Sequence, residues 1–95
     1  MRKQLEDYYP GDEVWRDSAQ IARQQYWTDS PLQREILRQV NGDSDLAGMI
    51  YAKVGDGCLE WLHMRVPALA GRKPINCFVS EAHLRRLREA LMRMD

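Results

Sequence analysis

Few side chains in this 95-residue chain have the spacing of a catalytic or metal-binding motif. Its two histidines, His63 and His83, lie outside metal motifs such as HExxH, and its two cysteines, Cys58 and Cys77, show no CxxC or Cys/His ligand spacing. Apolar neighbours surround each thiol, which favours buried free cysteines that behave as small hydrophobic residues. We expect His63 to be a surface or interface side chain on a short helix and not a catalytic one.

The carboxylates have simpler roles as helix caps than as catalytic groups. Asp12, Asp43 and Asp56 each stand where a helix is expected to begin, and aspartate is a favoured N-cap residue. Residues 55–57, Gly-Asp-Gly, are too few for a phosphate-binding loop and lack its Lys and Ser/Thr. The sequence also has no serine nucleophile elbow. We therefore expect neither an enzyme nor a cofactor or metal site.

Basic residues gather in the last third of the chain, although 14 basic residues balance 14 acidic ones overall. They are Arg72, Lys73, Arg85, Arg86, Arg88 and Arg93. On charge alone a solvated helix face is favoured, partly neutralised by Glu81, Glu89 and Asp95. The alternative is a surface for an acidic partner or a phosphate-rich ligand. The overall balance disfavours a chain whose main task is binding nucleic acid, because such domains carry a positive excess.

The elements that must position these residues are helices. Hydrophobic residues make up 44% and charged residues 29% of the chain, as in ordinary globular proteins. Helical periodicity without alternating strands predicts an all-α fold, a compact bundle of about five to six short helices with a Pro/Gly-rich corner before the C-terminal helix. We divide the chain into an arm at 1–11, an N-terminal helical part at 12–45 and a C-terminal domain at 46–95. The arm is expected to be loosely held unless its tyrosines dock on the body or on a partner.

Capping signals locate the helices of residues 12–45. A helix from Asp12 is expected to bury one face, made of Val14, Trp15, Ile21, Ala22 and Tyr26. The next helix begins with a capping box of Ser30 and Gln33, with Pro31 at its first position. It ends at Asn41-Gly42, since glycine accepts the left-handed conformation that closes a helix.

Three further helices are expected from residue 43 onward. The first starts at Asp43 or Ser44 and stops at Gly55, and Asp56 is expected to cap a short second helix. Two prolines and a glycine in residues 66–74 exclude one continuous helix there. Ser80 then caps the final helix.

The sequence has no export or membrane signal. The N-terminus lacks the apolar core of a signal peptide, and no apolar run approaches the roughly 20 residues that span a bilayer. We expect a cytoplasmic protein without membrane association.

Residues 46–95 also follow a fixed order of short motifs. An apolar helix leads to a Gly-Asp turn at 55–56, a Trp-Leu pair at 61–62, and the loop 67–74, which reads Pro-Ala-Leu-Ala-Gly-Arg-Lys-Pro. A short apolar turn at 75–78 precedes a final helix with paired arginines at 85–86. This order and spacing resemble the Xre/MbcA/ParS antitoxin toxin-binding domain, which covers about half of the chain.

The chain departs from that family in places. Ala70 replaces the first of two paired glycines, a change that is tolerated if the position needs no positive φ and strains the loop otherwise. The residues before 46 do not match the family's helix-turn-helix, so DNA binding through this chain alone is not expected.

The resemblance implies a non-catalytic antitoxin that neutralises a RES-type, NAD-consuming toxin by binding it, with its C-terminal end near the entrance of the toxin's active site. Carried onto this sequence, the implied partner surface comprises Arg72, Lys73, Arg86, Arg93, Met94 and Asp95. The implied structural motif comprises Trp61, Leu62, Pro67, Leu69, Gly71 and Pro74. The alternative is a regulator, or a phage or accessory protein of the same fold, that binds DNA weakly or a different host protein.

Self-association, as a dimer, is expected because a small bundle with this many aromatic residues should leave some exposed. The candidates are Tyr8, Tyr9, Trp15 and Trp27, and burial of these rings is the alternative.

Overall fold

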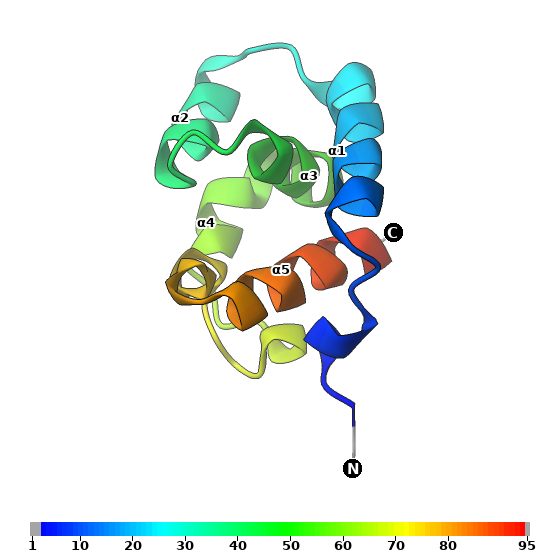
Figure 1. Cartoon of the computed structure of the whole chain (residues 1–95). Helices are drawn as coiled ribbons and strands as arrows, with labels where there is room; N and C mark the ends of the chain where they lie inside the picture. The colour runs from blue at the N-terminus through cyan, green and yellow to red at the C-terminus, as the bar shows by residue number, and fades with distance from the viewer. Residues whose placement is uncertain (1–2, 95) are drawn as a thin grey trace.

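The computed structural model describes residues 3–94, which form five α-helices and four short 3-10 helices (Figure 1). The α-helices are α1 Asp12–Tyr26, α2 Pro31–Gln39, α3 Ser44–Val54, α4 Cys58–Leu62 and α5 Glu81–Arg93. The 3-10 helices are η1 Leu5–Tyr8, η2 Gly55–Gly57, η3 Pro67–Leu69 and η4 Pro74–Val79. Across residues 3–94 the only β pairing is an isolated bridge between Val66 and Arg72. The predicted all-α bundle is confirmed.

Three helix starts are capped as predicted. Ser30, Asp43 and Ser80 each accept, through the side-chain oxygen, the backbone N–H three residues further on, at 3.0–3.2 Å. Such caps satisfy N–H groups that have no partner within the helix. The cap predicted at Asp56 is wrong: this residue lies inside η2, and α4 starts after Gly57 without a side-chain cap.

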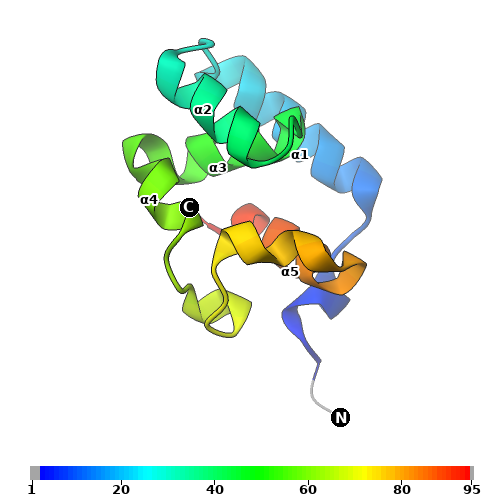
Figure 2. The ribbon, with the colours of Figure 1, turned by 90° about the vertical axis from the view of Figure 1, so that its left-hand side faces the viewer.

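Helix α3 is the central element of the bundle. It lies between α1 and α2, while α5 crosses below them (Figures 1 and 2). Its buried residues run without interruption from Leu46 to Ile50, as expected for a helix covered on several sides. Gly48 lies against the side-chain stem of Arg23 in α1, and a Cβ at this position would overlap that stem. Arg23 then reaches Asp45 in an ion pair of 2.9 Å.

The predicted inner face of α1 is partly wrong. Trp15, Ala19 and Ala22 are buried, at spacings of four and three residues that form one helical stripe. Val14 and Ile21 are 45% and 57% exposed, because they lie one residue, or about 100°, away from that stripe. Trp15 is only 2% exposed, so its predicted place on a self-association surface is also wrong.

None of the helices in residues 3–94 is long and apolar enough to cross a membrane.

Candidate functional site

The Pro/Gly corner between α4 and η4 is a closed and anchored loop. The Val66 N–H donates to the Arg72 carbonyl, and the Gly71 N–H donates to the Val66 carbonyl, both at 3.1 Å. Leu69 is fully buried beneath the loop. These bonds satisfy the backbone of the corner internally, so its side chains are presented on a fixed frame.

Two consecutive residues of the corner have left-handed backbone. Ala70 has φ +56° and Gly71 has φ +77°. Glycine takes this conformation without steric cost, whereas alanine does not. Ala70 therefore occupies the strained alternative that the sequence left open.

The structural motif predicted around this corner divides into buried and exposed members. Leu62 and Pro74 are buried, and Trp61 is partly buried against the core. Pro67 is exposed and opens η3, where its fixed φ suits the first helical position.

Three cations are gathered at this corner. Arg65 and Arg72 are exposed and Lys73 is half-buried, and together they line a shallow polar hollow of about 410 Å³ with Gly71 and Asn76 among its other residues. The Arg65 guanidinium donates to the Gly71 carbonyl at 3.3 Å. Within residues 3–94, none of the three cations forms an ion pair. We call Arg65, Arg72 and Lys73 the basic corner.

Arg65 was not among the residues that the sequence predicted for a partner surface. A signal for it exists, because residues 61–80 contain three basic residues and no aspartate or glutamate.

The arginines of α5, in contrast, are neutralised within the chain. Arg85 pairs with Glu81 at 3.2 Å and Arg93 with Glu89 at 2.7 Å, both one turn apart. Arg86 donates two hydrogen bonds to Glu6, at 2.8 and 2.9 Å.

Arg86, which was predicted as a partner contact, is thus engaged with Glu6 within the chain. Its side chain is 14% exposed, and that of Glu6 is 18% exposed. The hydrogen bonds from Arg86 lower the pKa of the Glu6 carboxyl, although burial opposes this, and they raise the pKa of Arg86. Both shifts favour the charged pair.

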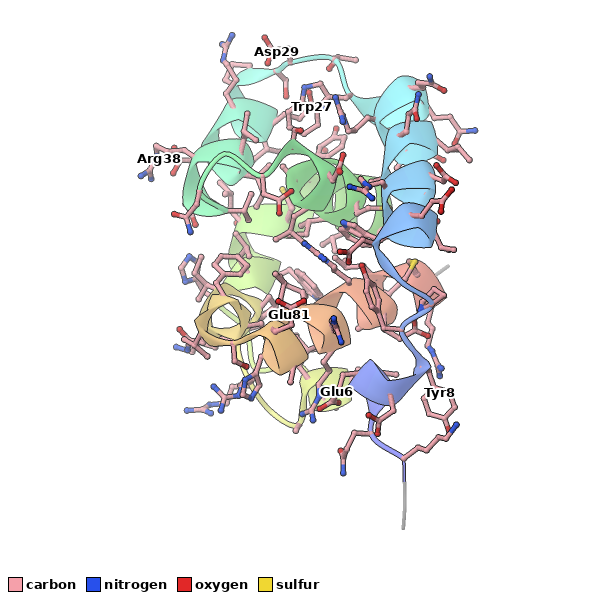
Figure 3. All side chains as sticks on the ribbon, in the orientation of Figure 1. Glu6, Tyr8, Trp27, Asp29, Arg38 and Glu81 are labelled. Atoms are coloured by element: carbon pink, nitrogen blue, oxygen red, sulfur yellow. The ribbon has the colours of Figure 1, made fainter. Side chains whose placement is uncertain are left out.

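The described part of the N-terminal arm, residues 3–11, is docked on α5 through η1. Figure 3 shows Glu6 on the side of the arm that faces the body and Tyr8 on the outer side. The Tyr9 hydroxyl donates to Asp12 at 2.8 Å and accepts from Arg88 at 3.3 Å. Burial is the main reason why the pKa of Tyr9 is raised.

The predicted self-association residues thus differ in availability. Tyr9 is engaged with the body, while Tyr8 remains 50% exposed. Trp27 is partly buried and packs edge-on against Tyr51, with ring centroids 6.5 Å apart. Their role in self-association stays a prediction.

The C-terminal end of α5 carries the remaining predicted partner residues. The Arg93 side chain is 53% exposed, although it pairs with Glu89. Met94 is partly buried, and its carbonyl accepts a hydrogen bond of 2.8 Å from Lys53. Asp95 lies outside the described residues.

The two thiols are buried, and each histidine ring lies beside a polar side chain. Cys58 and Cys77 are free and fully buried as predicted, and burial raises the pKa of both. His63 is exposed, with Nε2 3.0 Å from a side-chain oxygen of Gln39. His83 is partly buried, with Nδ1 2.6 Å from the Ser80 hydroxyl. In the part of the chain that the structure describes, no three Cys, His, Asp or Glu residues are grouped as metal ligands.

Fold and site together define a small helical protein with a basic corner whose three cations form no ion pair among the described residues. Comparisons with protein-family models, curated proteins and solved structures find no match for this chain. The resemblance of residues 46–95 to the antitoxin domain therefore stays a prediction.

Proposed function

We propose that this chain is an antitoxin-like protein that binds and neutralises a RES-type, NAD-consuming toxin through its C-terminal helical domain. The observation that carries the proposal is the basic corner, whose three cations find no acidic partner within residues 3–94. The motif order of residues 46–95 supports the choice of toxin class. A cytoplasmic location and a homo-oligomeric state belong to the same proposal.

The corner suits an acidic protein surface for two physical reasons. Within residues 3–94 its cations have no ion pair to give up on binding, so attraction to a negative surface is not offset by a lost ion pair there. The backbone bonds between Val66 and Arg72 also hold the loop in place, which reduces the entropy lost when a partner is bound.

Co-expression with a RES-type toxin tests the proposal. The wild-type chain is expected to rescue growth and to co-purify with the toxin, while Arg72→Glu with Lys73→Glu loses both effects. The matched control reverses two exposed charges elsewhere, Arg16→Glu with Arg34→Glu, and should keep the complex. The proposal is wrong if the wild-type chain neither rescues growth nor forms a complex with the toxin of a neighbouring gene.

The second candidate is a regulator that binds DNA, because the same three cations match phosphate groups as well. Three phosphate contacts would make the logarithm of the binding constant fall with the logarithm of salt concentration at a slope of about −3. A gel shift at two salt concentrations distinguishes the candidates. Salt-sensitive DNA binding that Arg72→Glu abolishes favours the regulator.

A further inference from the structure

The N-terminal arm occupies one face of α5, and the match between them is chemical as well as steric. We call Arg86, Arg88 and Arg93 the α5 arginine face. Each of the three contacts a group from residues 6–12: Arg86 binds Glu6, Arg88 binds Tyr9 and Asp12, and Arg93 lies 5.0 Å from the centre of the Tyr8 ring. The arm thus supplies carboxylates and tyrosine rings to guanidinium groups.

Such contacts are those of a peptide-recognition surface. A bidentate arginine–carboxylate pair fixes one acidic side chain in position, and a guanidinium over an aromatic ring adds a second, less directional attraction. Leu5 and Tyr9 add partly buried apolar contacts with the core. Within this chain, the α5 arginine face thus binds an acidic segment that carries tyrosine.

The arm is joined to the body by a short hinge. Pro10 is exposed, and Gly11 takes φ +112° with open space around it before α1 begins at Asp12. A short tether holds the arm near its surface at an effective concentration on the order of millimolar. Weak intrinsic affinity is then enough to keep it docked, and a stronger ligand can displace it.

We infer that the α5 arginine face is a docking surface for an acidic, tyrosine-bearing segment of a protein partner, and that residues 4–12 occupy it in the free chain. The inference deepens the proposed function only by adding this second contact surface to the basic corner. The partner would displace Glu6 from Arg86, and the freed arginines would then bind the partner's carboxylates. This explains why side chains suited to a partner are covered in the free chain.

The test uses the full chain and a fluorescent synthetic peptide of residues 3–13. In the wild-type chain the tethered arm competes with this peptide, whereas in Glu6→Gln the competitor has lost its charged contact. We expect the peptide to bind Glu6→Gln about tenfold more tightly than wild type, since charge-assisted hydrogen bonds are about twice as strong as neutral ones. Adding Arg86→Gln to Glu6→Gln should remove that gain.

Matched controls separate this surface from general charge effects. Glu81→Gln removes an equal charge from an exposed pair on the same helix and should bind the peptide as wild type does. Circular dichroism of each variant checks that α5 remains folded. A second peptide carrying Gln in place of Glu6 should bind the Glu6→Gln chain about tenfold more weakly than the first peptide.

Two results would overturn the inference. The first is equal peptide binding by wild type and Glu6→Gln. The second is a wild-type dimer, seen by sedimentation at rising concentration, that Arg86→Gln abolishes, since the natural occupant would then be the arm of a second copy. The peptide assay contains no toxin, and Arg72→Glu should leave it unchanged, so its failure is distinct from failure of the proposed function.

Discussion

Gln33 offers the sharpest test of how this bundle is held together. It is fully buried, and its side chain serves three backbone groups of the connection between α1 and α2. Its carbonyl oxygen accepts from the N–H groups of Thr28 and Ser30 at 2.9 and 3.0 Å, and its amide nitrogen donates to the Tyr26 carbonyl at 3.1 Å. Gln33 therefore links the end of α1 to the start of α2.

Replacing Gln33 with alanine leaves these three groups without a protein partner. Each lost bond costs about 1 kcal/mol when water replaces it and up to about 3 kcal/mol when the group stays buried. Because Tyr26 and Thr28 are exposed, water reaches part of the site, and we expect Gln33→Ala to lower the free energy of unfolding by about 2–4 kcal/mol. The whole chain is stabilised by only about 5–14 kcal/mol at the usual value per residue, so the effect is large.

The variant Gln33→Glu tests the hydrogen bonds that the Gln33 amide accepts separately from the one that it donates. The introduced carboxylate keeps two acceptors but places a negative oxygen beside the Tyr26 carbonyl, which disfavours the charged form and raises the pKa of that carboxyl in the folded state. Protonation restores a donor at this position. The free energy of unfolding of Gln33→Glu should therefore approach that of wild type as the pH falls from about 7 to about 5.

Urea denaturation followed by circular dichroism measures both effects. At a denaturant dependence on the order of 1–2 kcal/mol per molar, Gln33→Ala should lower the midpoint of unfolding by about 1–4 M. Gln20→Ala, an exposed glutamine on α1, is the control and should change the midpoint little. If Gln33→Ala lowers the free energy of unfolding by less than about 0.5 kcal/mol, the hydrogen bonds of Gln33 do not have the role assigned to them.

Three further outcomes are expected. Ala70→Gly should stabilise the chain by up to about 1 kcal/mol, because relief of about 1–2 kcal/mol of left-handed strain exceeds the added entropy of unfolded glycine, and a lower melting temperature would contradict this. Cys58 and Cys77 should resist iodoacetamide until denaturant is added, since both are buried with raised pKa values; mass spectrometry of native protein shows whether either is modified. The pKa of Glu6 is lower in the folded chain than in the unfolded one, so its pair with Arg86 stabilises the chain above the unfolded pKa and is lost as the pH falls through the lowered value; Glu6→Gln should flatten this part of the acid denaturation profile.

Local signals predicted the helix boundaries well, because capping depends on residues only a few positions apart. Ser30, Pro31 and Gln33 located the start of α2, and Asn41-Gly42 its end, where both residues have positive φ. The Pro/Gly corner was likewise predicted as a corner. What remained open there was the φ of Ala70, which depends on how the loop closes through Val66 and Arg72.

The buried face of α1 was harder to predict because large apolar residues dominate a periodicity argument. The predicted stripe correctly included Trp15 and Ala22 and missed Ala19, which is also buried. It wrongly included Val14, Ile21 and Tyr26, which are exposed. Close approach of α1 and α3 is also set by a small residue, because Gly48 leaves room for the side-chain stem of Arg23. Residues that allow close approach contribute little to hydropathy, so the packing geometry of two helices was not contained in the pattern of one.

The ion pairs of the candidate site were the feature that the sequence predicted least well. Glu6 and Arg86 are separated by eighty positions in sequence and meet at 2.8 Å, so no local rule connects them. A balance of 14 acidic and 14 basic residues describes only the sum. The fold decides which cations are neutralised, and it pairs the four α5 arginines at positions 85, 86, 88 and 93 while the basic corner finds no carboxylate within residues 3–94.

The pairing of charges also predicts the order in which the two proposed surfaces would contact a partner. Long-range attraction acts before contact and falls off over a Debye length of about 8–10 Å, so the unpaired basic corner should govern the first encounter with an acidic partner. The α5 arginine face can bind only after the arm has left it. Arg72→Glu should therefore lower mainly the association rate with a toxin, and Glu6→Gln should change mainly the rates of steps after encounter, which stopped-flow kinetics at two salt concentrations can separate. Equal effects of both variants on the salt-dependent association rate would contradict this order.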